Sequence, residues 1–221
     1  MAVAPLNKFL TVAVPVAPGE QTIYSTPVGV SAILLYAQVS NVGIGETYPT
    51  VSFTHRRKST ATRTAGNIRN NRIVKNVEIP PDDAVILIDG RLVLERSAII
   101  SDSIVIEGTQ TGIVSVYNCN YDNNTGLTTI TTYGPHNFSV NDQVTMSGLA
   151  FTCSSGSIGI TTTIFPSPQL SFTVTSIGIG GTIFETYGGT VTGIAHTYIG
   201  GGLVGPLQME FVCSILENST V

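Results

Sequence analysis

The chain has 221 residues, of which 42% are hydrophobic and 11% are charged, and its formal net charge is −4. This composition excludes general disorder, because a chain so apolar and so weakly charged can bury a core, and the length allows one large β-domain or two small ones. Val, Ile, Thr, Tyr and Phe are abundant between frequent glycines and prolines. No window of helical length has apolar residues at three- and four-residue spacing while being free of Gly, Pro and β-branched residues. The sequence therefore predicts an all-β protein.

The first half of the chain is predicted to be a series of strands. Residues 30–42 contain an apolar centre long enough for a fully buried strand, and residues 48–56 alternate between apolar and polar side chains. Residues 84–95, AVILIDGRLVLE, predict a hairpin, because Asp-Gly between two apolar runs is a strong signal for a tight turn. Further strands are expected at residues 21–27, 73–80, 103–108 and 112–118.

The following block differs in composition. Charged residues almost vanish, and the glycine clusters GIGG, YGG and IGGG separate short alternating stretches. These stretches predict short strands at residues 127–133, 142–148, 170–177 and 190–199. The block is therefore predicted to form a small β-module rich in glycine and threonine.

The end of the chain returns to the earlier pattern. Residues 207–215 alternate as a strand does, and a lone strand must pair either with the module or with the first domain. We favour the second interpretation. The predicted fold is an antiparallel, jelly-roll-like β-sandwich of residues 1–118 plus 206–221, with a second small β-domain, residues 119–205, inserted before its last strand.

Charge is distributed unevenly along the chain. All ten Lys and Arg residues lie at or before Arg96, whereas the rest of the chain carries seven acidic residues and no basic one. Lysine and arginine commonly guard exposed strand edges. The acidic half is therefore expected either to cover its edges with neighbouring chains, as a homo-oligomeric assembly subunit would, or to be a well-closed domain coated with Thr and Ser.

One stretch of the first half is strongly basic. No acidic residue occurs between Tyr48 and Val77, and this stretch carries seven cations: Arg56, Arg57, Lys58, Arg63, Arg69, Arg72 and Lys75. We interpret its polar centre, residues 56–72, as a loop that docks on an acidic surface of another subunit, with a merely solvated loop as the alternative. Nucleic acid is disfavoured, because the stretch lacks interleaved aromatics and the whole protein is acidic.

A catalytic interpretation is available for residues 129–153. His136, Asp142 and Cys153 are residue types of a nucleophilic site, but such a site needs side chains that converge in space. His136 and Asp142 are explained equally well by tight turns whose side chains bond the local backbone. The histidines His55, His136 and His196 have no metal-ligand spacing. We therefore expect no catalytic residues, no metal site and no cofactor.

The remaining sequence signals are weaker. Cys119 and Cys213 flank the second half and could pair, although buried free thiols are the simpler expectation. Pro15 and Pro18 interrupt the apolar core of the N-terminus, so we do not expect a signal peptide, and no apolar run reaches membrane-spanning length.

Several motifs resemble a known family. LNKF, YSTPVGVSAILLYAQVSNVG, FTHRR, EIPPDDAVILIDGRLVLE and the terminal SILEN resemble small β-sandwich virion proteins of tailed bacteriophages, particularly contractile-tailed marine cyanophages. The block beginning TTYGPHNFSVNDQVTMSGLAFTC resembles a β-module that recurs in cyanophage tail and other structural proteins. The long basic stretch departs from the short loop expected in that family.

The resemblance implies a non-enzymatic, multicopy virion subunit of the tail, neck or baseplate, assembled in the host cytoplasm with other virion proteins. Capsid decoration and a fibre-associated receptor- or glycan-binding module remain open. For a glycan site, the candidate side chains are Tyr133, Tyr187 and Tyr198, although the chain has no Trp.

Overall fold

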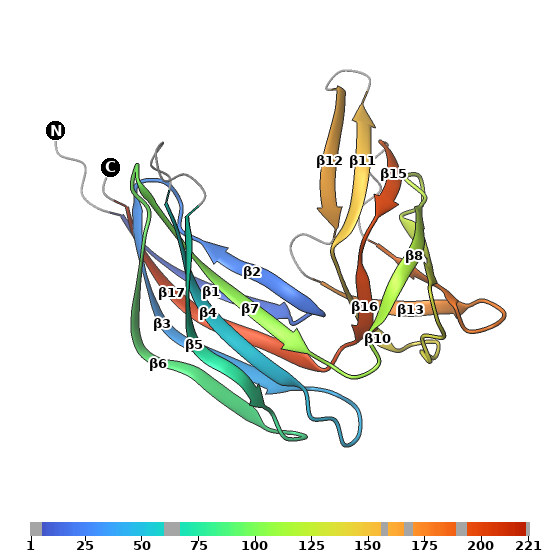
Figure 1. Cartoon of the computed structure of the whole chain (residues 1–221), viewed down its shortest axis with the longest axis horizontal. Coiled ribbons are helices and arrows are strands. Elements are labelled where there is room, and N and C mark those ends of the chain that lie inside the picture. Colours follow the sequence, from blue (N-terminus) through green and yellow to red (C-terminus); the bar gives the residue numbers. More distant parts are fainter. Residues whose placement is uncertain (1–5, 60–66, 156–158, 166–169, 189–193, 220–221) are drawn as a thin grey trace. The chain divides into compact units, whose positions relative to one another are not determined.

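The computed structural model describes residues 6–59, 67–155, 159–165, 170–188 and 194–219, and the secondary structure of these residues is entirely β (Figure 1). No helix in this part of the chain is long and apolar enough to cross a membrane. The chain divides into two compact units. The sandwich unit comprises Met1–Val16, Glu20–Thr109 and Met209–Val221, and the barrel unit comprises Ala17–Gly19 and Gln110–Gln208.

The sandwich unit is built from two four-stranded antiparallel sheets. Its strands are β1 (Leu6–Pro15), β2 (Gly19–Ser25), β3 (Val30–Asn41), β4 (Thr50–Ser59), β5 (Ile68–Glu78), β6 (Ala84–Glu95), β7 (Ile100–Thr109) and β17 (Met209–Ser219). The sheets have the orders β1-β17-β3-β6 and β2-β7-β4-β5. With β17 counted as the eighth strand, these orders are 1-8-3-6 and 2-7-4-5, which is the double Greek key of a jelly roll. The predicted fold class is confirmed.

The last strand completes the sandwich from the far end of the sequence. β17 lies between β1 and β3, with Phe211 opposite Val14 on one side and Val39 on the other. Its side chains alternate, so that Phe211, Cys213 and Ile215 are buried. The barrel unit is thus inserted between the seventh and eighth strands of the jelly roll.

The expected boundaries of the insertion need a correction. β8 (Val114–Tyr121) begins before residue 119, and it pairs with barrel strands on both sides. The barrel unit accordingly starts at Gln110 and ends at Gln208, rather than spanning residues 119–205. Strand pairing, which the local pattern of residues 112–118 does not encode, decides the boundary.

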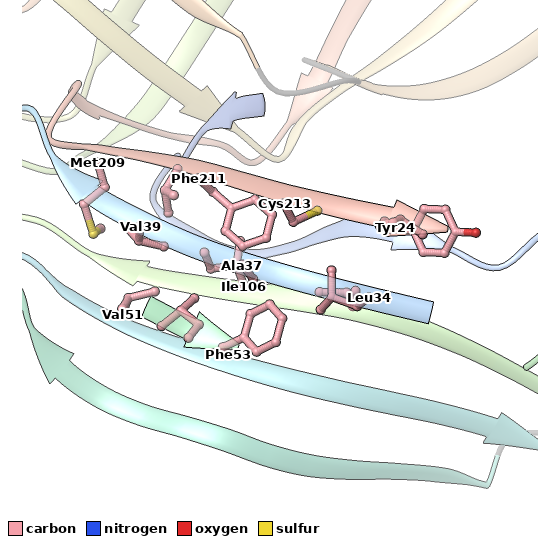
Figure 2. Close-up of a cluster of buried hydrophobic side chains, with 14 of the residues drawn as sticks. Tyr24, Leu34, Ala37, Val39, Val51, Phe53, Ile106, Met209, Phe211 and Cys213 are labelled. Atoms are coloured by element: carbon pink, nitrogen blue, oxygen red, sulfur yellow. The ribbon is translucent and has the colours of Figure 1, made fainter. Parts of the chain in front are cut away.

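The sandwich core lies between its two sheets (Figure 2). Phe53 of one sheet stacks on Phe211 of the other, with ring centroids 6.0 Å apart, and both are fully buried. Leu34 and Ile106 are equally inaccessible. Each such side chain contributes about 1.5–3 kcal/mol by leaving water. Since β17 supplies Phe211, the core of this unit is incomplete until the chain has returned from the barrel.

The predicted hairpin at residues 84–95 is wrong. These residues form the single strand β6, which pairs with β3 along its length. The register shifts between Leu34 and Tyr36, where Tyr36 faces Asp89, and Gly90 has a φ of +152°. Asp89-Gly90 therefore makes an irregularity in a continuous strand, because both apolar halves find partners on β3.

The barrel unit contains a closed six-stranded antiparallel barrel with the order β10-β13-β14-β9-β8-β16. Its other strands are β9 (Leu127–Thr132), β10 (Gln143–Ser147), β13 (Ser171–Ile177), β14 (Ile183–Tyr187) and β16 (Leu203–Pro206). Closure leaves no open edge on these six strands. For this part of the acidic half, the structure therefore favours the well-closed domain over edges covered by neighbouring chains.

Three more strands extend the barrel unit as the sheet β12-β11-β15, formed by β11 (Leu149–Ser155), β12 (Gly159–Phe165) and β15 (Ala195–Gly200). The ribbon of β10 and β16 continues into β11 and β15 across a glycine junction. Gly148, Gly201 and Gly202 all have positive φ. A Cβ on Gly201 would lie 2.8 Å from the Gly148 carbonyl oxygen, so a side chain there would collide with backbone.

Candidate docking surface and polar clusters

The basic stretch forms a β-hairpin rather than the expected loop. β4 and β5 pair antiparallel from Thr50 opposite Glu78 to Lys58 opposite Ile68. β5 is the edge strand of its sheet, and most of its side chains are exposed on both faces. Arg63 lies in residues 60–66, outside the described part of the chain. The first part of β5, residues 68–72, is solvated on both faces and lacks the apolar alternation by which strands are recognised, which explains why the sequence indicated a loop there. The strand expected at residues 73–80 corresponds to the second part of β5.

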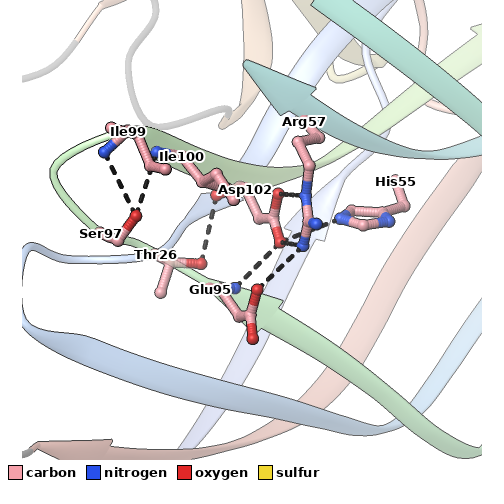
Figure 3. A network of polar contacts seen from close by, with 8 residues as sticks. All are labelled: Thr26, His55, Arg57, Glu95, Ser97, Ile99, Ile100 and Asp102. Atoms are coloured by element: carbon pink, nitrogen blue, oxygen red, sulfur yellow. Dashed lines mark hydrogen bonds and ion pairs between the residues drawn. The ribbon is translucent and has the colours of Figure 1, made fainter. Parts of the chain in front are cut away.

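Arg57 is held inside the sandwich unit by a buried carboxylate (Figure 3). The Nε and Nη2 atoms of Arg57 donate to Oδ1 and Oδ2 of Asp102, each at 2.7 Å. Asp102 is the cross-strand partner of Arg57 on β7 and is fully buried. The amide of Glu95 also donates to Asp102, at 3.0 Å, and the Glu95 carboxylate accepts from Arg57 at 3.3 Å.

The charge on Asp102 is stabilised by these contacts. Burial alone would raise the pKa of Asp102, but hydrogen bonds from Arg57 and from the Glu95 amide outweigh burial, and the pKa lies below its usual range. His55 Nε2 lies 3.3 Å from Asp102 Oδ2 without the alignment of a hydrogen bond. The Thr26 amide and hydroxyl donate to the Asp102 carbonyl. The cluster thus ties β4 and β7 to the ends of β2 and β6.

Arg56 is also engaged within the unit. Its two terminal nitrogens donate to the Glu20 carboxylate at 2.8 and 2.6 Å, and its Nε donates to Asn70 at 2.8 Å. The hydrogen bonds from Arg56 lower the pKa of Glu20. The charges of Arg56 and Arg57 are therefore neutralised by carboxylates within this chain. Both residues are weaker docking candidates than the sequence suggested, because a partner would have to compete with formed bidentate pairs.

The other basic residues of the hairpin remain exposed. Lys58, Arg69, Arg72 and Lys75 all face solvent, and within the described residues none of them forms an ion pair. Ile68 is 54% exposed in the same hairpin. β5 also presents the unpaired backbone groups of a sheet edge. The hairpin thus combines an open edge, cations that form no ion pair among the described residues, and exposed apolar surface.

An open groove lies where β4 ends and β5 and β7 begin. It has a volume of about 480 Å³ and is lined by Arg57, Ser59, Asn67, Ile68, Arg69, Ile99 and Ile100. Its lining is mixed: isoleucines supply apolar surface and Arg69 supplies positive charge. The groove could accept an apolar side chain flanked by acidic groups.

The catalytic candidates of the sequence do not converge. His136 is buried, with Nδ1 accepting from the Phe138 amide at 3.0 Å and Nε2 lying 3.2 Å from the Ile183 carbonyl oxygen. Asp142 accepts from the Ser139 amide at 2.7 Å. Both side chains hold the turn between β9 and β10, as their structural interpretation predicted. The sulfur of Cys153 instead lies 2.6 Å from Nδ1 of His196, a pairing that sequence spacing did not indicate.

The other candidates have structural explanations. All three cysteines are free, and Cys119 and Cys213 are buried in separate cores, where burial raises their pKa values to about 12 and about 11. The described residues contain no group of three metal-ligating side chains. Tyr198 donates its hydroxyl to the Gly201 carbonyl, so it stabilises the glycine junction. Tyr133 and Tyr187 are exposed.

The fold and these clusters define a jelly roll that carries an inserted β-barrel and a basic, open-edged hairpin. No protein-family model matches the sequence, and no curated protein gives a significant match.

Similarity to solved structures is distant. Infectious bursal virus-derived T=1 particles give 10% identity and a TM-score of 0.28 over 99% of this chain and 40% of theirs, so this chain spans less than half of that protein. The stem and receptor-binding domain of spike protein P1 from bacteriophage PM2 gives 8% identity and 0.22 over 99% of both chains. A tandem CBM22 domain of Xyn10C from Paenibacillus barcinonensis gives 7% and 0.24 over 98% of this chain and 94% of its own. We draw no functional conclusion from likenesses at these scores.

Proposed function

We propose that this chain is a non-enzymatic virion structural protein, present in several copies in the tail, neck or baseplate of a tailed bacteriophage. Its sandwich unit docks on the particle, and its barrel unit projects or bridges to a neighbour. The sequence motifs that resemble phage β-sandwich proteins support this proposal. The jelly-roll topology is compatible with it, because this fold serves in many viral shells, although it also serves in lectins and enzymes.

The observation that carries the docking proposal is the open edge of β5 with its three exposed cations, Arg69, Arg72 and Lys75, and the exposed Lys58 on the neighbouring β4. β5 has 11 residues and pairs with β4 on one side only, and among the described residues no strand pairs with its outer edge, so this edge is a template for another chain. Natural proteins protect such edges with charge, and here three of the four charged side chains of β5 are cationic: Arg69, Arg72 and Lys75, against Glu78 at its end. A partner with an acidic surface could therefore neutralise the mutual repulsion of these cations and, in the same step, pair its backbone with the edge of β5.

The partner that these features favour is another virion protein with an acidic face. A second copy of this chain also qualifies, since residues 97–221 carry no basic side chain and seven acidic ones, all of them at least partly exposed except the buried Asp102. Nucleic acid fits less well, because the described strands of the hairpin, Thr50–Ser59 and Ile68–Glu78, offer one aromatic side chain, Phe53, and it is fully buried.

Charge reversal tests the docking surface. We expect particles that carry the Arg72→Glu, Lys75→Glu double variant to lose most of this protein, measured as its stoichiometry in purified particles. The matched control is Lys8→Glu, Arg91→Glu, which reverses two exposed cations on β1 and β6 and should leave occupancy unchanged. Wild-type occupancy of the Arg72, Lys75 variant would refute docking through β5.

The principal alternative is a fibre-associated module that binds a glycan or host receptor. One observation favours it: Tyr117 and Tyr133 are 61% and 73% exposed, and their rings meet edge to face with centroids 5.3 Å apart. Exposed aromatic faces can stack on sugars. Replacing both tyrosines by serine would abolish host adsorption under this alternative and leave it unchanged if the chain only docks. Capsid decoration would be distinguished by the position of the chain on the particle.

A further inference from the structure

The barrel unit contains a cysteine and a histidine that face each other across two strands. Cys153 of β11 and His196 of β15 are direct cross-strand partners, and the sulfur lies 2.6 Å from His196 Nδ1. Both side chains are partly exposed, so solvent and small molecules can reach them. The ring of Tyr121 meets the imidazole edge to face, with centroids 5.4 Å apart. The pair is thus held by strand register and by ring packing.

This arrangement has the chemistry of an activated nucleophile. A thiol reacts as its thiolate, and an imidazole within hydrogen-bond reach can take the thiol proton and stabilise the resulting anion. From Ser97 to the end of the chain there is no Lys or Arg, so histidine is the only side chain in this tract that can become cationic. The other histidine of the tract, His136, is buried in its turn. His196 is therefore the group that can activate a thiol here.

The other two thiols of the chain differ from Cys153 in their exposure and in their cross-strand partners. Cys119 and Cys213 are buried, and burial raises the pKa of each, which keeps them protonated and protected. Neither is paired across strands with a histidine: Cys119 faces Ile130, and Cys213 faces Val12 and Ala37. The protein thus presents one accessible thiol beside a base and two inert ones.

We propose that Cys153 is a reactive thiol, activated by His196, that is modified by small disulfides through thiol–disulfide exchange. The Cys153 thiol gives its proton to His196 Nδ1, and the thiolate attacks one sulfur of R–S–S–R. The S–S bond of the reagent breaks, a Cys153–S–S–R bond forms, and R–S⁻ leaves and is protonated by His196 or water. Both electrons of the broken bond leave with R–S⁻, so no further oxidant is required.

The rates of disulfide exchange at the three cysteines can be compared within the same protein, native and unfolded. Reduced protein is mixed with oxidised glutathione at pH 7, and peptide mass spectrometry follows adducts at all three cysteines, first in the native protein and then in urea. An ordinary thiol is only a few per cent ionised at pH 7, so complete activation has a ceiling of about thirtyfold. A stabilised thiolate is also a weaker nucleophile, so we expect native Cys153 to react about threefold to tenfold faster than unfolded Cys153. Cys119 and Cys213 should react more slowly when native.

Two variants separate activation from mere exposure. His196→Gln keeps a polar side chain without a base, and it should lower the rate at native Cys153 at least threefold. Thr161→Val changes the other cross-strand neighbour of Cys153 and should leave the rate unchanged. Equal rates for folded His196→Gln and wild type would overturn the proposal. If His196→Gln does not fold, the comparison within the wild type decides: a native Cys153 that reacts no faster than the unfolded one would equally overturn it.

Discussion

The buried Arg57–Asp102 pair offers a sharp test of the structure. Three variants form a double-mutant cycle: Arg57→Met, Asp102→Asn and the two together. The pair was chosen because Asp102 is fully buried and receives two hydrogen bonds from Arg57 and one from the Glu95 amide. Arg57→Met leaves the buried Asp102 without its hydrogen-bonded counter-charge, whereas Asp102→Asn leaves Arg57 with only the Glu95 carboxylate at 3.3 Å.

The expected losses of folding stability follow from how deeply each partner is buried. Removing one partner of a buried ion pair costs about 3–5 kcal/mol, since the remaining charge is uncompensated. The Arg57 side chain is 36% exposed, which weakens the interaction, so we expect about 3 kcal/mol for Arg57→Met. Asp102→Asn leaves an arginine that can reach water and should cost about 2 kcal/mol. The double variant should be more stable than the sum of the two single effects predicts, by about 2 kcal/mol.

The pH dependence has a definite sign. The pKa of Asp102 is lowered in the folded state, so its contribution is fully present above the unfolded pKa, which is about 3.9 for an aspartate, and is lost as the pH falls through the folded value. Wild type should therefore exceed Asp102→Asn in stability at pH 7 and at pH 5, and the difference should shrink below about pH 4.

Hydrogen exchange read by mass spectrometry suits this test, because it reports strands of the sandwich unit separately from those of the barrel unit. Peptides of β4 and β7 should lose protection in the single variants, and barrel peptides should not. Strict additivity in the double variant, or a stability difference independent of pH between 3 and 7, would refute the ion pair as the source of stability.

Two further predictions concern the barrel unit. Gly201→Ala should destabilise the unit more than Gly180→Ala does, by about 1–3 kcal/mol. Both glycines have positive φ, but only a Cβ at Gly201 would meet backbone, because it would lie 2.8 Å from the Gly148 carbonyl oxygen. Equal shifts in melting temperature, measured by calorimetry, would contradict this close approach. His136→Phe keeps an aromatic ring but orphans the Phe138 amide, so urea denaturation should show a loss of about 1–3 kcal/mol, and an unchanged midpoint would show that His136 does not hold the turn.

The architecture was accessible from the sequence wherever apolar periodicity coincided with burial. The alternation of Met209, Phe211, Cys213 and Ile215 predicted a strand, and the change of composition before it predicted the return to the sandwich. Asp89-Gly90 led to the wrong prediction of a hairpin, because its local turn signal is overridden by pairing with β3, which is a long-range property. The first half of β5 was missed for the opposite reason. The expected strand began only at residue 73, because both faces of this edge strand are solvated and Asn70 and Asn71 stand where a half-buried strand would carry an apolar residue.

The polar clusters were less predictable, because their members are far apart in sequence. Arg57 and Asp102 are 45 residues apart, and Cys153 and His196 are 43 apart. Only strand register brings each pair together. His136 and Asp142 bond groups within a few residues, so turn chemistry alone explained them. The docking role of the basic stretch remains a prediction, now concentrated on Lys58, Arg69, Arg72 and Lys75.

The proposed role is tested most directly by an electron cryo-microscopy reconstruction of the phage particle in which this chain can be traced. We predict several symmetry-related copies in the tail, neck or baseplate, each with the β5 edge against an acidic surface of a neighbouring subunit. Particles that lack the chain, or copies in which β5 faces solvent and Arg72 and Lys75 touch no other protein, would contradict the account.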